Sequence, residues 1–111
     1  MDALPGGYDV ILLAREAGEV LGCVALKPLQ DGACELKRLY VRSGARGRGL
    51  GRALTDAAVA EARRLGYATL RLDTLPAMRA ARAIYASLGF RPTERFNDNP
   101  IAGVIFFELL L

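Results

Sequence analysis

The sequence predicts a mixed α/β domain, in which helices pack against one layer of mostly antiparallel sheet. Three observations predict this fold class. The N-terminal part holds apolar runs separated by glycine-containing turns, and the later part alternates helix-like with strand-like segments. A chain of 111 residues, of which 52% are hydrophobic, is also large enough to bury a core. We therefore expect one domain over residues 1–111, with the element order β-β-β-α-β-α-β-β.

The N-terminal part is typical of an antiparallel meander of three strands. The turns Glu16-Ala17-Gly18-Glu19 and Gln30-Asp31-Gly32 separate its apolar runs. In the register that these turns predict, Cys23 lies opposite Leu39. The three strands are expected over Val10 to Arg15, Val20 to Leu29 and Ala33 to Val41.

A helix is predicted over Leu50 to Leu65, because apolar residues recur there at helical spacing and Gly66 interrupts the pattern. A strand over Thr69 to Leu75 is expected to follow. The apolar face of the helix contains Leu54, Ala57, Ala58, Ala62 and Leu65.

A second helix is centred on Tyr85, with Pro76 in its first turn and Gly89 as its C-terminal cap. Its apolar residues, at positions 77, 81, 84, 85 and 88, share one face, so Tyr85 is expected to point toward the sheet. Two closing strands are expected around Thr93 to Phe96 and Val104 to Leu111.

Composition excludes several kinds of chemistry. The chain has no histidine, which rules out Ser-His-Asp and Cys-His nucleophilic schemes, and its two cysteines are too few for a zinc site. We expect no metal, and we expect Cys23 and Cys34 to be free thiols. The N-terminus lacks a basic region, and the run Val10 to Ala14 is too short for a signal peptide or a membrane span. A cytoplasmic protein without membrane contact is therefore expected.

A net charge of +3 raises nucleic acid as a partner. Arginines are dense around residue 46, but acidic residues are mixed through the chain and no row of aromatic residues accompanies them. A local basic patch suits one polyphosphate ligand better than a polymer. Nucleic acid is therefore the less favoured partner.

The segment Arg46-Gly47-Arg48-Gly49-Leu50-Gly51 lies between a predicted strand and a predicted helix. A glycine-rich turn at this place forms an anion-binding site, because backbone N–H groups and the helix dipole point at the same ligand. A Walker loop is excluded, since no Lys-Ser or Lys-Thr follows Gly49. The dinucleotide fingerprint is excluded as well, because Arg52 occupies the position of its third glycine. A turn without any ligand is the structural alternative.

This loop and the later segment Ala81-Arg82-Ala83-Ile84-Tyr85-Ala86-Ser87-Leu88-Gly89-Phe90 resemble the two cofactor motifs of the GNAT superfamily of acetyl-CoA-dependent N-acetyltransferases. The resemblance implies that acetyl-CoA is the cosubstrate. It also implies that backbone groups of Leu39, Tyr40 and Val41 bind the pantetheine arm and polarise the thioester carbonyl. The pyrophosphate would then bind the N–H groups of Arg46, Gly47, Arg48, Gly49, Leu50, Gly51 and Arg52.

In this family the tyrosine that matches Tyr85 faces the coenzyme sulfur as a general acid, whereas spacing alone favours a core tyrosine. Many members carry an asparagine that holds the pantetheine arm at the position where this chain has Met78. The resemblance also implies that Glu35, on the strand before the loop, is the general base. The alternative is a solvated glutamate paired with Lys37 or Arg38.

The acceptor is expected to be a primary amine of a small molecule or a peptide. The loop Asn97-Asp98-Asn99-Pro100 matches a place where family members often line the acceptor pocket, and we single out Asp98 and Asn99. Turn chemistry explains the same residues without a function. A non-catalytic acyl-CoA-binding module is the alternative function, and a basic nucleic-acid-binding domain is a weaker one.

The resemblance covers nearly the whole chain but begins late in the family pattern, which usually places a strand and two helices before the segment that matches Val10 to Arg15. The sequence therefore predicts a fragment or a naturally short form. The run Val10-Ile11-Leu12-Leu13 becomes a candidate unpaired edge, and one face of the sheet is expected to lose its cover. We expect self-association, most simply as a two-fold homodimer, with the apolar end Val104 to Leu111 as a second possible contact.

Overall fold

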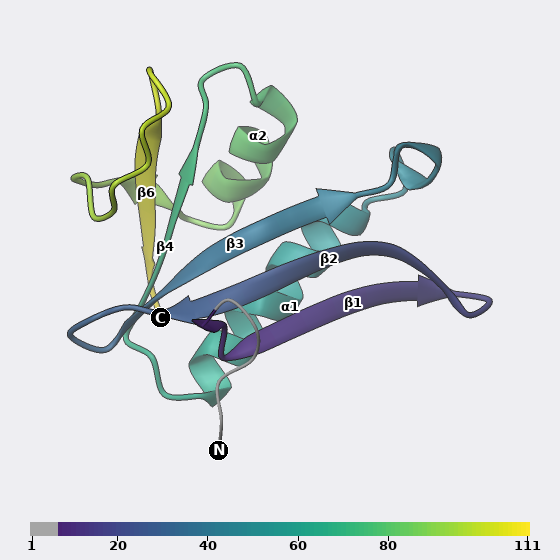
Figure 1. Ribbon diagram of the computed structural model, residues 1–111, viewed down its shortest axis with the longest axis horizontal. Helices are drawn as coiled ribbons and strands as arrows, with labels where there is room; N and C mark the ends of the chain where they lie inside the picture. Colours follow the sequence, from purple (N-terminus) through teal and green to yellow (C-terminus); the bar gives the residue numbers. More distant parts are fainter. Residues whose placement is uncertain (1–6) are drawn as a thin grey trace.

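A computed structural model describes residues 7–111 of the chain. Within these residues, strands β1 to β6 form one sheet in the spatial order β1-β2-β3-β4-β6-β5 (Figure 1). Strands β3 and β4 are parallel, and the other neighbouring pairs are antiparallel. The predicted mixed, mostly antiparallel α/β fold is confirmed.

The meander consists of β1 (Val10–Glu16), β2 (Glu19–Pro28) and β3 (Ala33–Val41). The prediction that Cys23 lies opposite Leu39 is wrong: Cys23 pairs with Tyr40, because the register shifts between Cys23 and Ala25 and β3 holds one extra residue there. Arg38, inside this bulge, has a left-handed φ of 58°. Cys23 and Cys34 are free thiols, as predicted.

Helix α1 spans Leu50–Arg64. Its predicted buried face is wrong in part, because Ala57 and Leu65 are exposed whereas Thr55 and Val59 are buried. Thr55 tolerates burial because its hydroxyl donates a 2.7 Å hydrogen bond to the Gly51 carbonyl. The buried face of α1 is therefore rotated by about one residue from the apolar face that the sequence predicts. It consists of Leu54, Thr55, Ala58, Val59 and Ala62.

Strand β4 (Thr69–Thr74) leads into helix α2 (Arg79–Ser87), which begins later than predicted, so Pro76 precedes the helix and Ala77 is exposed. The chain then forms β5 (Arg91–Pro92) and β6 (Ile105–Leu110). The prediction of a strand around Thr93 to Phe96 is wrong. Phe96 leaves the ladder and packs edge-on against Phe106, with ring centroids 5.3 Å apart.

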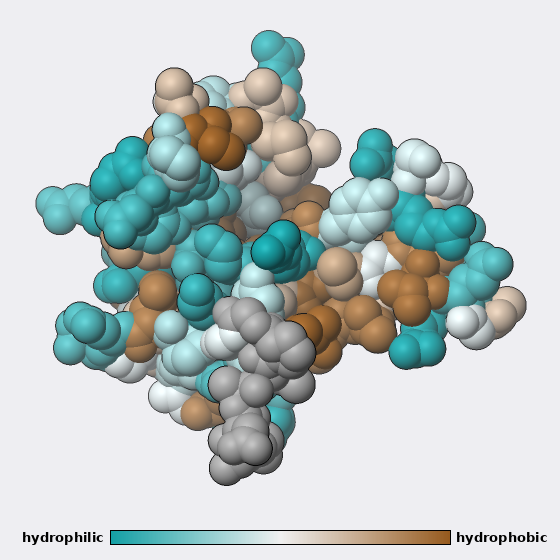
Figure 2. Space-filling model, viewed as in Figure 1, coloured by the Kyte–Doolittle hydropathy of each residue, from teal (hydrophilic) through white to brown (hydrophobic). Residues whose placement is uncertain are grey.

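Both helices cover the same face of the sheet, where Val24, Leu26, Leu70 and Leu72 form the core with α1 and with Tyr85 of α2. The opposite face is open over β1 to β3, and Figure 2 shows apolar side chains gathered on it. Strand β1 is the sheet edge, as predicted, and Ile11 and Leu13 are 43% and 45% exposed. Neither helix in the described part of the chain is long and apolar enough to cross a lipid bilayer.

Candidate functional site

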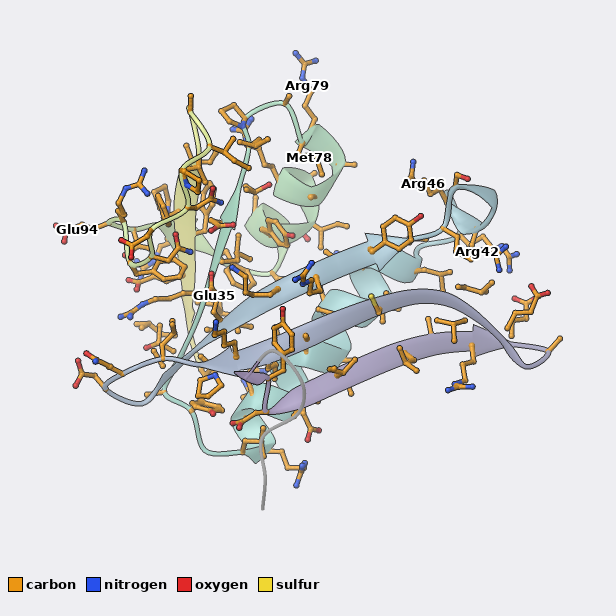
Figure 3. All side chains as sticks on the ribbon, in the orientation of Figure 1. Glu35, Arg42, Arg46, Met78, Arg79 and Glu94 are labelled. Atoms are coloured by element: carbon orange, nitrogen blue, oxygen red, sulfur yellow. The ribbon has the colours of Figure 1, made fainter. Side chains whose placement is uncertain are left out.

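Strands β3 and β4 diverge and open a cleft. They pair only from Ala33 to Glu35 and from Thr69 to Arg71, after which β3 turns away (Figure 1). The remainder of β3 therefore presents backbone groups that no neighbouring strand satisfies on the β4 side. A cleft of about 300 Å³ lies at this divergence, lined by parts of β3, β4, α2 and the segment from 99 to 104. In Figure 3 Glu35 lies near the point where β3 and β4 part, Met78 lies at the start of α2, and Arg46 lies beyond the far end of β3.

The glycine loop has the geometry of an anion site. Gly47 and Gly49 have left-handed φ values of 84° and 77°, and a Cβ atom on either glycine would have nothing within 4 Å. Gly49 is the N-cap of α1, which has neither a side-chain cap nor an acidic residue in its first turn. The first N–H groups of the helix therefore have no protein partner in the described chain and point their positive ends outward.

The arginines of this loop differ in what they contact. Arg48 pairs with Glu16 at 2.6 Å, and Arg42 pairs with Glu19 at 3.4 Å, so the turn between β1 and β2 holds both. The Arg46 Nε atom donates to the Val41 carbonyl oxygen at 3.1 Å. Arg52 lies on α1 between the two helices, 3.4 Å from Asp56 and 2.9 Å from the Ser87 hydroxyl. These pairs are exposed, so each contributes about 1 kcal/mol or less to stability, and an incoming phosphate can displace them.

Tyr85 lines the cleft with only 5% of its surface exposed. Its ring packs against Phe90, with centroids 5.6 Å apart. No buried polar side-chain atom of residues 7–111 lacks a hydrogen-bond partner, and the Tyr85 hydroxyl has no protein partner there, so this oxygen reaches the cleft. Burial, and secondarily the negative charge of Asp73, raises the pKa of Tyr85 to about 12. Tyr85 thus belongs both to the core and to the cleft.

Two asparagines and two carboxylates form a polar network at the base of the cleft. The Asn97 amide donates to Asp73 at 2.7 Å and to Glu35 at 2.8 Å. Asn99 donates to Asp73 at 3.2 Å, and Lys37 donates to Glu35 at 3.2 Å. These hydrogen bonds hold the segment after β5 against the sheet. They also give both carboxylates the polar partners that a carboxylate needs when it is removed from water.

The two carboxylates differ in access. Glu35 is only 3% exposed and is not part of the cleft lining, whereas Asp73 lines the cleft. Glu35 does pair with Lys37, as the structural alternative held, but it is buried and not solvated. Sequence reasoning missed Asp73 as a site residue. The sequence pattern that could have indicated it is weak: a single acidic residue at the end of a buried strand, shortly before the Tyr85 helix.

Of the other predicted residues, some line the cleft and others lie outside it. Leu39 and Asn99 line the cleft, whereas Asp98 is exposed and lies outside it. Met78 also lines the cleft and is 53% exposed. It is the N-cap of α2, and it supplies no side-chain cap. Asn97, which the sequence did not distinguish from its neighbours, joins the two carboxylates.

The comparisons place the chain among the acetyltransferases. The model of the Acetyltransferase (GNAT) family matches residues 3–90. This match covers more than half of the chain, and the chain belongs to the GNAT family. An uncharacterized N-acetyltransferase of Schizosaccharomyces pombe is 42% identical over 104 residues, which cover 92% of this chain and 64% of that protein. The chain thus spans less than two-thirds of that relative's length.

Two solved structures share the fold. A structure from Klebsiella pneumoniae, assigned as an acyl-CoA N-acyltransferase, has a TM-score of 0.85 at 34% identity and covers 97% of this chain, which covers 76% of that one. A GNAT acetyltransferase from Elizabethkingia anophelis with acetyl-CoA bound has a TM-score of 0.78 at 23% identity, with 91% of this chain and 75% of that one covered. At that identity the second likeness concerns the fold alone.

Proposed function

We propose that this protein is an N-acetyltransferase that moves an acetyl group from acetyl-CoA directly to a primary amine in a ternary complex. The observations that carry the proposal are the uncapped N-terminus of α1 and, in the cleft between β3 and β4, the free edge of β3 and the Tyr85 hydroxyl. These features suit, in order, a pyrophosphate, an extended arm with amide groups and a thioester.

Each part of coenzyme A has a proposed partner. The pyrophosphate binds the N–H groups from Gly47 to Arg52, where Gly49 keeps the approach free of side chains. The pantetheine arm lies along β3 from Leu39 to Val41 and pairs with its unsatisfied backbone groups. Met78, on the opposite wall, offers the arm apolar contact in place of an amide.

We also propose that the protein is cytoplasmic.

The transfer needs a neutral amine. An alkylamine with a pKa of about 10.4 is neutral in fewer than about one molecule in a thousand at pH 7, so a base must accept its proton. We assign this role to Asp73, which lines the cleft, in place of Glu35, which is enclosed. Glu35 is then a positioning residue that holds Asn97 against Asp73. Nitrogen attacks the thioester carbon, the N–C bond forms, the C–S bond breaks, and the amine proton leaves through Asp73.

Tyr85 acts on the departing thiolate. Its phenol, with a pKa near 12, is protonated at neutral pH and can donate a hydrogen bond to the sulfur. A thiol has a pKa of about 8.5, so complete proton transfer from Tyr85 would be uphill by about 5 kcal/mol. We therefore assign Tyr85 mainly as a hydrogen-bond donor that stabilises developing charge on sulfur, with the final proton supplied by solvent.

The second candidate is a module that binds acyl-CoA without transfer. What favours it is the open sheet face over β1 to β3, because an acceptor can be held firmly only where walls surround it. A nucleic-acid module has less support, since the arginines of the loop contact acidic side chains and helix groups instead of forming one free basic track.

Two measurements test the proposed function. Thermal shifts with CoA, dephospho-CoA and a polynucleotide identify the ligand, and thiol release from acetyl-CoA across several classes of amine identifies the reaction. Stabilisation by CoA together with amine-dependent thiol release supports the transferase. Stabilisation without release supports the binding module. Salt-sensitive stabilisation by the polynucleotide alone contradicts both.

A further inference from the structure

The charged groups that line the cleft lie on two different walls. Lys37 and Arg38 come from β3, and Asp73 comes from β4. Lys37 is neutralised by the buried Glu35 at 3.2 Å. Among residues 7–111, Arg38 has no acidic partner, and its Nε atom donates to the Tyr8 hydroxyl at 2.8 Å. Asp73 likewise has no cationic partner there, since its contacts are the amides of Asn97 and Asn99. The cleft therefore holds one uncompensated cation and one uncompensated anion.

The bulge in β3 places Arg38 at this wall. In a regular strand, Lys37 on the open face would be followed by a residue on the helix-covered face. The register shift changes this alternation, so that Arg38 is exposed and Leu39 packs against the core. Arg38 adopts a φ of 58°, which is unfavourable for a side chain of this size. A strained backbone that exposes a cation at the wall of a cleft is typical of a functional position.

A simple alkylamine would bind only one of these two charged side chains. Its ammonium group would lie at Asp73, and the Arg38 guanidinium would gain no anionic partner. A molecule with both an ammonium and a carboxylate satisfies both walls. Arginine also suits a carboxylate in particular, because its planar donors match the two oxygen atoms.

Building on the proposed transferase function, we propose that the acceptor is an amino acid or another small amine that carries a carboxylate. Its carboxylate binds Arg38, and its amino group lies at Asp73 and Asn99. The reaction is the one given above: the acceptor nitrogen forms the amide bond, the thioester C–S bond breaks, and CoA leaves as the thiol. Arg38 contacts the acceptor and not the reacting atoms, so it determines specificity.

Matched acceptors test this inference directly. Free amino acids are compared with their carboxamides in the thiol-release assay at saturating acetyl-CoA, because each pair differs only in the charge that Arg38 would bind. We expect kcat/KM for the preferred amino acid to exceed that for its carboxamide by about tenfold or more. Carboxamides that react as well as the acids would overturn the inference and leave the transferase intact. Failure of every amine of either class would contradict both.

The variant Arg38→Asn separates binding of the carboxylate from a structural role. Asparagine tolerates the left-handed φ at this position better than other residues that carry a side chain, so the bulge is retained. We expect KM for the amino acid to rise about tenfold, with kcat and the KM of the carboxamide within about threefold of the parent values. Arg15→Asn, on exposed β1 away from the cleft, is the matched control and should change neither KM. Equal losses on both acceptors in Arg38→Asn would overturn the proposed role of Arg38.

Discussion

Asp73 and Tyr85 line the same cleft from different elements, and the negative charge of Asp73 adds to the burial that raises the pKa of Tyr85 to about 12. The two side chains come from the end of β4 and from α2. A bound ammonium group beside Asp73 would offset that charge and favour ionisation of Tyr85 relative to the free protein. The acceptor would thus influence Tyr85, the proposed hydrogen-bond donor to the sulfur.

Tyr85→Phe removes the hydroxyl and keeps the ring that packs on Phe90. We expect kcat to fall by about ten- to a thousandfold, while CoA affinity and Tm change little, because only the donor to sulfur is lost. Since the pKa is near 12, ionisation of Tyr85 should not lower the parent rate below about pH 10. Steady-state kinetics with thermal shifts measure all three quantities.

Tyr67→Phe is the control, because the Tyr67 hydroxyl bonds Asp9 outside the cleft. It should reduce stability by about 1 kcal/mol and leave kcat unchanged. If Tyr85→Phe instead reduced stability with normal turnover per folded molecule, Tyr85 would be a core residue only.

Asp73→Asn keeps the size of the side chain and removes the proposed base. We expect kcat/KM at pH 7 to fall by about a hundredfold or more, with the deficit shrinking toward pH 10 as neutral amine becomes abundant. Glu35→Gln should chiefly destabilise the fold, by about 1–3 kcal/mol, because Glu35 is enclosed by Lys37 and Asn97. If Glu35→Gln, and not Asp73→Asn, displaced the pH–rate profile upward, the base would be Glu35.

Gly49→Glu should abolish CoA binding, because it places a side chain and a negative charge where the pyrophosphate is expected. Gly66→Glu is a matched control, since Gly66 also has a left-handed φ and open space around its Cβ position but follows the opposite end of α1. Both variants should lose about 1–2 kcal/mol of stability from backbone strain, and only Gly49→Glu should lose the thermal shift with CoA. Retained binding in Gly49→Glu would place the phosphates elsewhere.

Met78→Asn should raise both the stability of the fold and the affinity for CoA. Asparagine is a preferred N-cap residue, and α2 has no side-chain cap at this position, so we expect about 0.5–1 kcal/mol of added stability by chemical denaturation. The new amide also faces the cleft where the pantetheine arm is expected, so CoA affinity should rise by several-fold. Met78→Ser, a capping residue with less reach, should reproduce the stability gain alone. An unchanged affinity in Met78→Asn would contradict the proposed path of the arm.

Self-association is expected from the exposed edge at β1, where Ile11 and Leu13 present apolar side chains. Light scattering over a range of concentrations should detect a dimer, and Leu13→Lys should shift it toward the monomer, because a charge on an edge strand opposes pairing. Leu110→Lys, at the exposed end of β6, tests the second predicted contact. A monomer at every concentration would refute the prediction.

The sequence by itself determined the order of elements, the glycine loop and the face on which Tyr85 lies. These are local features: turn glycines, helical spacing and the absence of β-carbon atoms act within a few residues of one another. The same reasoning gave the strand bounds of the meander within about one residue, because both turns contain glycine at positive φ.

Only the tertiary structure decided which carboxylate faces the cleft and which is enclosed. Glu35 and Asp73 lie on different strands, and they are joined by Asn97 from a segment far along the chain, so no local pattern could rank their access. The bulge at Arg38 also depends on pairing with β2, since an extra residue is visible only against the strand that opposes it. Periodicity describes one element at a time, whereas the site is made where several elements meet.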